Sequence, residues 1–244
     1  MRSIYAATII LLFLFGPAHA ADPIPVEDFM AHSKYRNLQI SPDGQHLAVI
    51  APVEGINHLV FLDISDVNKP EQVAVLQAPS GEEVATVTWV NDERAIYMTS
   101  IVEGSLEIPR LTGRVTAVNY DGTKEKLLWS VQKEKTFPSI IDTIEDDDDF
   151  VIVSHQGINR AKPIVERLNV YSGRTSRFGV SPLDRGGVLL DDDQNLRFAI
   201  GQDDELEWHA AYRKEVNGDW QTFENPLGGE ALPLGISGDD RTVF

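Results

Sequence analysis

The chain has 244 residues, a formal net charge of −17 at neutral pH and no cysteine. The negative charge repels nucleic-acid phosphates and therefore argues against nucleic acid as a partner. Without cysteines no disulfide contributes to stability, so the fold depends on its apolar core.

Residues 1–20 are predicted to be a cleaved signal peptide. Arg2 supplies a positive charge, residues 6–15 form a short apolar run, and Ala18-His19-Ala20 has the spacing of small residues found at cleavage sites. The run is shorter than the roughly 20 residues that a membrane-spanning helix needs. An uncleaved anchor is the alternative. We expect an exported protein, periplasmic or secreted, that does not contact the membrane once the leader is removed.

Residues 21–37 are predicted to be a separate amino-terminal segment. Pro23 and Pro25 keep its start extended, and residues 26–30 are expected to form one helical turn with an apolar face. This face is expected to pack on the first repeat.

Residues 38–244 are predicted to form an incomplete β-propeller, because a strand–turn–strand pattern returns along the chain. Its first copy has the turn Ser41-Pro42-Asp43-Gly44, in which Pro42 fixes φ and Gly44 accepts positive φ. The expected blades span residues 38–77, 84–131, 138–180 and 187–224, and a fifth, incomplete blade spans residues 231–244.

Each complete unit is expected to contain four short strands. The predicted strands are residues 38–40, 46–51, 57–63 and 71–76; 84–90, 95–100, 114–120 and 126–131; 139–144, 150–154, 165–171 and 174–180; 187–190, 196–201, 206–213 and 220–223; and 232–236 and 241–244. Four strands at a period of roughly 45–50 residues are typical of propeller blades. A β-sandwich also has many short strands, but the regular place of an acidic or glycine-containing turn favours the propeller.

Three motifs resemble the amino-terminal part of exported serine peptidases of the prolyl oligopeptidase family. They are P-V-E-D-F at residues 25–29, S-P-D-G at residues 41–44 and W-V-N-D-E-R at residues 89–94. The S-P-D-G motif alone is also found in unrelated propellers of the TolB kind, so the combination and its order carry the resemblance. It covers residues 25–244.

The resemblance implies a propeller, commonly seven-bladed, that caps an α/β-hydrolase domain with a Ser-Asp-His triad. This chain contains no G-x-S-x-G motif, and no catalytic position of the family can be assigned to it. We therefore expect a non-catalytic cap that gates access of a peptide substrate to a hydrolase domain absent from this chain. The alternative is a stand-alone periplasmic, TolB-like propeller that binds a protein or a small ligand.

Two acidic runs, residues 146–149 and 191–193, are candidate calcium-binding sites, because hard cations bind carboxylates. Their spacing does not match a known calcium loop, so both are predicted to be solvated turns. A propeller enzyme of the lactonase kind would need carboxylates or histidines repeated on the inner strands around an axial metal, and the sequence does not show them.

The histidines and tryptophans are interpreted as structural. No histidine pair has metal-ligand spacing, and Ser154 and His155 point to opposite faces of an extended strand. His209 is expected to be packed in its strand, and all four tryptophans are expected to pack between blades. The sequence therefore predicts no catalytic, cofactor-binding or metal-ligating residue, and no cofactor.

Overall fold

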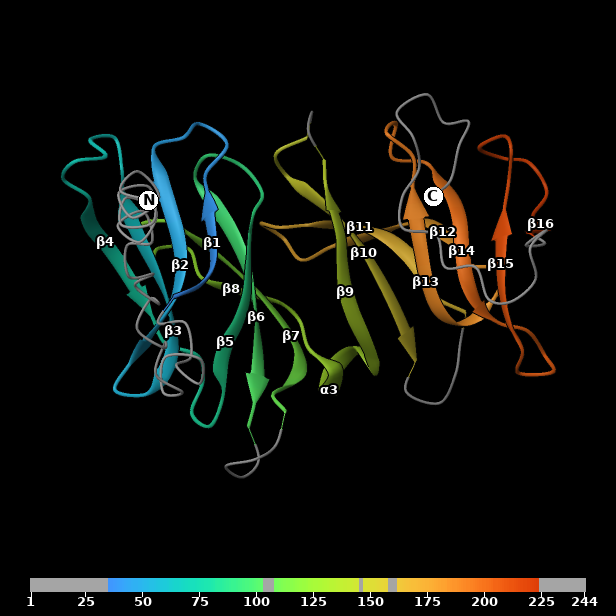
Figure 1. Cartoon of the computed structure of the whole chain (residues 1–244), viewed down its shortest axis with the longest axis horizontal. Helices are drawn as coiled ribbons and strands as arrows, with labels where there is room; N and C mark the ends of the chain where they lie inside the picture. Colours follow the sequence, from blue (N-terminus) through green and yellow to red (C-terminus); the bar gives the residue numbers. More distant parts are fainter. Residues whose placement is uncertain (1–34, 103–107, 145–146, 158–161, 224–244) are drawn as a thin grey trace, which may run out of the picture. The chain divides into compact units, whose positions relative to one another are not determined.

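The computed structural model describes residues 35–102, 108–144, 147–157 and 162–223 (Figure 1). The predicted signal peptide, most of the amino-terminal segment and the predicted fifth blade lie outside these residues.

The described chain folds into four antiparallel sheets of four strands, each sheet following the order of the chain. The first sheet contains β1 (Arg36–Ile40), β2 (His46–Val53), β3 (Ile56–Asp63) and β4 (Glu71–Leu76). The second contains β5 (Glu83–Trp89), β6 (Arg94–Ile101), β7 (Arg110–Asn119) and β8 (Lys126–Trp129). The third contains β9 (Thr136–Thr143), β10 (Phe150–Gly157), β11 (Ile164–Asn169) and β12 (Thr175–Val180). The fourth contains β13 (Asp184–Leu190), β14 (Leu196–Gln202), β15 (Trp208–Tyr212) and β16 (Gln221–Phe223).

Three buried clusters join these sheets in sequence. Phe61 of the first sheet packs with Val87 and Tyr97 of the second. The second sheet packs on the third through another cluster, and the third packs on the fourth through the last. Leu59 and Phe61, which share one face of β3, are fully buried. Consecutive four-stranded sheets packed in this way are propeller blades, so the predicted all-β fold class is confirmed.

The turn after β1 has the predicted chemistry. The Ser41 hydroxyl and the Gln45 amide both donate to Asp43 Oδ1, at 2.5 Å and 3.0 Å, and Gly44 has a φ of 74°. The Ser41 hydroxyl first, and the Gln45 amide second, hold the pKa of Asp43 below its usual value. The carboxylate thus serves the turn itself.

Most predicted strand boundaries differ from the structure, by up to four residues at the start of β7, and two of the differences have a clear local cause. The eighth strand ends at Trp129 rather than at residue 131, because Ser130 precedes a one-turn helix, α3 (Val131–Glu134). The strand predicted at residues 206–213 begins only at Trp208, because Leu206 has a φ of 69°, outside the β region. No helix in the described part of the chain is long and apolar enough to cross a membrane.

Glycines allow a close backbone approach where β13 meets β14. The pairing shifts register between Asp184 and Gly187, which marks a bulge. A Cβ atom on Gly186 would lie 1.7 Å from the Ile200 carbonyl oxygen, and one on Gly201 would lie 2.4 Å from the Asp184 oxygen. These clashes are with backbone atoms, which cannot move aside as a flexible side chain would.

We therefore expect Gly186→Ala to lower the free energy of unfolding by about 1–3 kcal/mol through overpacking. Gly187→Ala is the matched control, because a Cβ atom there meets nothing within 4 Å. Urea denaturation of the two variants measures the difference. Equal stability of the two variants would contradict the close approach.

Candidate functional site

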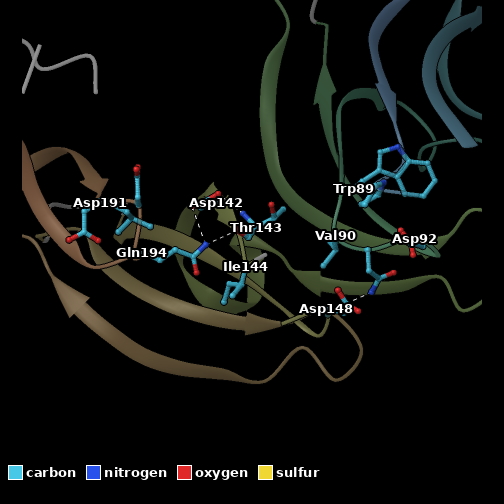
Figure 2. Close-up of a pocket in the computed structure, with 13 residues that line it drawn as sticks. Trp89, Val90, Asp92, Asp142, Thr143, Ile144, Asp148, Asp191 and Gln194 are labelled. Carbon is cyan, nitrogen blue, oxygen red and sulfur yellow. Dashed lines mark hydrogen bonds between the residues drawn. The ribbon is translucent and has the colours of Figure 1, made fainter. Parts of the chain in front are cut away.

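A cavity of about 730 Å³ collects side chains from all four sheets (Figure 2). In each sheet they come from the region where the first strand turns into the second. The lining residues are Pro42 from the first sheet; Trp89, Val90, Asn91 and Asp92 from the second; Asp142, Thr143, Ile144 and Asp148 from the third; and Leu190, Asp191, Asp192 and Gln194 from the fourth. The repeated turns that organise the sequence thus meet at one site.

The cavity is acidic. Five aspartates line it, and its described lining contains no lysine, arginine or histidine. Carboxylates gathered in a concave site focus a negative potential and favour ligands with an ammonium or guanidinium group.

The aspartates have different roles, which corrects the prediction that both acidic runs are solvated turns. Asp191 is only 5% exposed, and its Oδ2 lies 3.0 Å from Arg197 Nη1. Its Oδ1 accepts the Asn195 amide at 2.6 Å, so Asp191 holds the turn together. Asp192 is exposed, as predicted, and is free to face a ligand.

The other run divides in the same way. Asp147 Oδ2 accepts a hydrogen bond from Arg167 Nη2 at 2.5 Å, whereas Asp148 and Asp149 are exposed. Asp146 lies outside the described residues.

Side-chain amides of the cavity wall form hydrogen bonds from one sheet to the next. Gln194 Nε2, from the fourth sheet, donates to the Thr143 carbonyl of the third at 2.8 Å. Asn91 Nδ2, from the second sheet, donates to the Asp148 carbonyl at 2.7 Å and to the Tyr171 hydroxyl at 3.1 Å. Each bond joins a turn to its neighbour and so fixes the width of the wall.

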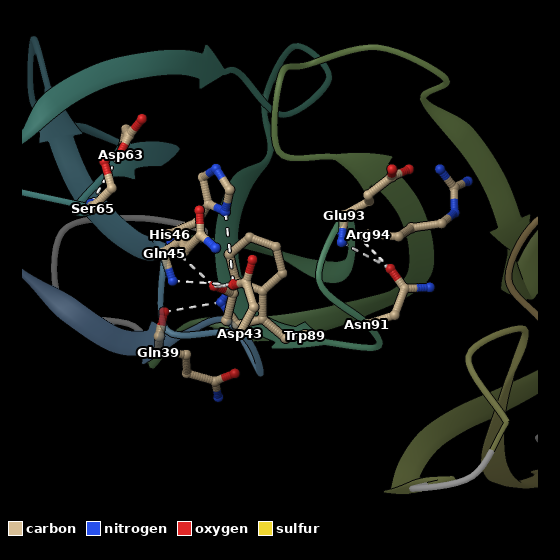
Figure 3. A network of polar contacts seen from close by, with 11 residues as sticks. Gln39, Asp43, Gln45, His46, Asp63, Ser65, Trp89, Asn91, Glu93 and Arg94 are labelled. Atoms are coloured by element: carbon tan, nitrogen blue, oxygen red, sulfur yellow. Dashed lines mark hydrogen bonds and ion pairs between the residues drawn. The ribbon is translucent and has the colours of Figure 1, made fainter.

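The segment W-V-N-D-E-R, residues 89–94, forms most of the hydrogen bonds around the turn between β5 and β6 (Figure 3). Trp89 Nε1 donates to the Gln39 carbonyl of the first sheet at 2.9 Å. Asn91 Oδ1 accepts the backbone amides of Glu93 and Arg94, at 3.0 Å and 2.8 Å, which closes the turn. One short segment therefore contacts both neighbouring sheets.

Arg94 lies at the centre of these ties and is only 1% exposed. Its Nε donates to the Val170 carbonyl of the third sheet at 3.0 Å, and its Nη1 donates to Asn119 Oδ1 at 2.7 Å. Nη1 and Nη2 also donate to the Lys124 carbonyl, at 3.3 Å and 3.2 Å. Burial lowers the pKa of the Arg94 guanidinium, and Tyr171, whose ring lies 4.8 Å from the guanidinium carbon, opposes that shift.

None of the four described histidines, His46, His58, His155 and His209, lines the cavity. His155 is buried 4.7 Å from the Trp129 ring, with its Nε2 3.2 Å from Glu166 Oε2. It neighbours Ser154 along β10, where successive side chains point to opposite faces.

His209 corrects the prediction of a packed strand histidine. It is half-buried, and its Nε2 lies 2.7 Å from Asp203 Oδ2. Glu207 completes a group whose ligand atoms lie within 4.8 Å of one another. In the sequence this group has the spacing D-x-x-x-E-x-H across one hairpin. The direct hydrogen bond accounts for this geometry, and we assign no metal to it.

The tryptophan prediction holds for Trp89 and Trp129, which are buried between sheets. It is wrong for Trp208, which is 47% exposed at the start of β15. Trp220 is half-buried, with the Arg213 guanidinium 4.9 Å from its ring centre.

No family model and no curated protein sequence matches the chain. Among solved structures, TolB from Acinetobacter baumannii is 11% identical, with 77% of this chain and 43% of that chain covered and a TM-score of 0.46. An acylaminoacyl peptidase is 13% identical, with 77% and 32% covered and a TM-score of 0.46. A prolyl endopeptidase is 12% identical, with 77% and 27% covered and a TM-score of 0.42. The chain thus spans less than half the length of these three proteins. A likeness at this level of identity and TM-score does not indicate a function.

We expect Arg94→Lys to lower the free energy of unfolding by about 2–4 kcal/mol, because one ammonium cannot serve the acceptors that the planar guanidinium reaches in three directions. Urea denaturation measures the loss. Arg174→Lys is the control, because Arg174 is exposed and its substitution should change stability by less than about 0.5 kcal/mol. Equal stabilities would show that the Arg94 bonds contribute nothing.

Proposed function

We propose that this chain is the propeller portion of an exported serine peptidase of the prolyl oligopeptidase family, and that it filters peptide substrates without taking part in the chemistry. The observation that carries the proposal is the acidic cavity built from the first turn of all four sheets. It provides a concave recognition site at the place where the repeats converge.

The motifs that resemble the family support the proposal through their positions. The S-P-D-G turn contributes Pro42 to the cavity, and W-V-N-D-E-R contributes Trp89, Asn91 and Asp92. Arg94 of the same segment stabilises the cavity wall through its hydrogen bond to the Val170 carbonyl. The motifs that carry the resemblance are therefore the ones that build the cavity.

The second candidate is a stand-alone periplasmic propeller of the TolB kind, with the same cavity holding a protein segment or a small cationic ligand. Its support is that the described chain consists of propeller blades alone, each packed on the next. The two candidates differ in whether a nucleophilic serine belongs to the same polypeptide.

An antibody raised against this chain separates the two candidates. From cells that make the protein, we expect it to recover a polypeptide much larger than 27.1 kDa that a fluorophosphonate probe labels at one serine. The purified chain itself should stay unlabelled and serves as the control. An unlabelled polypeptide of any size, or labelling of the purified chain, would contradict the peptidase proposal.

The filtering role makes a separate prediction about that larger polypeptide. Replacing both Asp92 and Asp192 with Asn should lower kcat/KM severalfold for peptides rich in Lys and Arg and leave neutral peptides unaffected, because the electrostatic attraction is lost. Asp193→Asn is the matched control, since Asp193 is exposed in the same turn but does not line the cavity. A uniform loss for all peptides, or no loss, would exclude a charge filter.

A further inference from the structure

A second cavity, of about 250 Å³, lies between the third and fourth sheets. No residue lines both this cavity and the acidic one. Its described lining contains no carboxylate, lysine or arginine, so it differs from the acidic cavity in charge. The lining includes Phe137, Ser139, Ser154 and Gln156 of the third sheet and Gly186 and Val188 of the fourth. His155 lines it as well, although its ring lies 4.7 Å from that of Trp129.

Both cavities lie along the same two strands. On β9, residues 137 and 139–141 line the second cavity, and residues 142 and 143 line the acidic one. On β13, residues 186–188 line the second cavity, and Leu190 lines the acidic one. The two cavities therefore follow one another along the junction of the third and fourth sheets.

A bulge on β9 places side chains of both cavities on one face of the third sheet. Ser139 pairs with Ser154, Asp142 pairs with Ile152, and the register shift leaves Ile141 as the extra residue. Ser154 and Ile152 are two residues apart on β10, so they and their partners share a face. Ile152 belongs to the apolar cluster shared with the fourth sheet, which identifies that face. Along the strand, the two serines and the Asp142 carboxylate are therefore about 7 Å apart.

The lining of the second cavity is suited to an uncharged aromatic side chain with a polar tip. The hydroxyls of Ser139 and Ser154 and the amide of Gln156 can each donate and accept hydrogen bonds. None of these three side chains is hydrogen-bonded to another described residue, so they are available to a ligand. Phe137 is 46% exposed and adds an aromatic surface. Tyrosine has both the ring and the hydroxyl that these groups would bind.

We propose that the two cavities are adjacent subsites for one extended peptide. A lysine or arginine side chain enters the acidic cavity, and a tyrosine side chain enters the second. This inference rests on the proposed function and names the peptides that the propeller selects. In an extended peptide, side chains two residues apart lie on one face and are about 7 Å apart, which matches the spacing of Asp142 and the two serines. Lysine and tyrosine two or four residues apart can therefore occupy both subsites, whereas a spacing of one or three places them on opposite faces.

Calorimetric titration of the purified full chain with capped peptides tests the second subsite. Each peptide has threonine at every position except one lysine and one tyrosine, in both orders and at spacings of one to four residues. At a spacing of two or four, we expect binding severalfold tighter than at one or three, because both side chains are held at once. Replacing the tyrosine with phenylalanine should lose part of this gain, since the hydroxyl partner is missing. This comparison needs no variant of the protein.

Substitutions in the protein test the same subsite from the other side. The double substitution Ser139→Ala and Ser154→Ala should remove the preference for tyrosine over phenylalanine and leave lysine-dependent binding unchanged. Ser176→Ala is the matched control, because Ser176 is exposed on β12 of the same sheet and lines neither cavity. An equal effect of the control and the double variant would overturn the assignment of the two serines.

The outcomes separate this inference from the function on which it rests. Lysine-dependent binding that is insensitive to the tyrosine and to its spacing would overturn the second subsite and leave the acidic filter standing. No binding of any peptide at low salt would overturn both the second subsite and the filter. Whether the chain belongs to a serine peptidase is decided separately, by fluorophosphonate labelling of the larger polypeptide.

Discussion

The burial of the Arg94 guanidinium is the constraint on which the middle of the structure depends. An ionised group removed from water is costly unless hydrogen bonds replace its hydration. Arg94 makes four such bonds to uncharged oxygens, from Val170 in the third repeat and from Asn119 and Lys124 in the second. All of these acceptors must be in place at once, so the guanidinium allows little variation in how the second sheet meets the third.

That fixed junction determines the geometry of the acidic cavity. The second turn carries Asp92 and reaches the third through Asn91, whose amide holds the Asp148 carbonyl. Gln194 connects the third turn to the fourth in the same manner. The solvent-facing carboxylates of this cavity therefore lie on turns that hydrogen bonds hold in place. A recognition site needs side chains in such fixed positions. Apolar packing between the blades stabilises the fold, and hydrogen bonds between neighbouring turns fix the positions of the residues that line the cavity.

The parts of the fold that depend on neighbours in sequence were predictable. The S-P-D-G turn follows from Ser41, Asp43 and Gly44 alone, and the four-stranded repeats follow from alternation and turn spacing. The cavity combines turns from separate repeats, so no single stretch of the sequence predicts it. The burial of Arg94 depends on an acceptor, Val170, that is 76 positions away. The burial of Asp191 depends on its partner Arg197 in the following strand. The exposure of Trp208 depends on which strand end lies at the surface, and a strand pattern does not contain that information.

Amide hydrogen exchange on the Arg94→Lys variant tests the role of this junction most directly. If Arg94 holds the second and third turns in register, residues 147–149 and 170–173 should lose protection, while the hairpin of β1 and β2 keeps the protection it has in the natural chain. A uniform loss of protection over all four sheets would mean that Arg94 stabilises the fold without positioning the turns. Unchanged protection at residues 147–149 and 170–173 would mean that apolar packing alone sets the cavity wall.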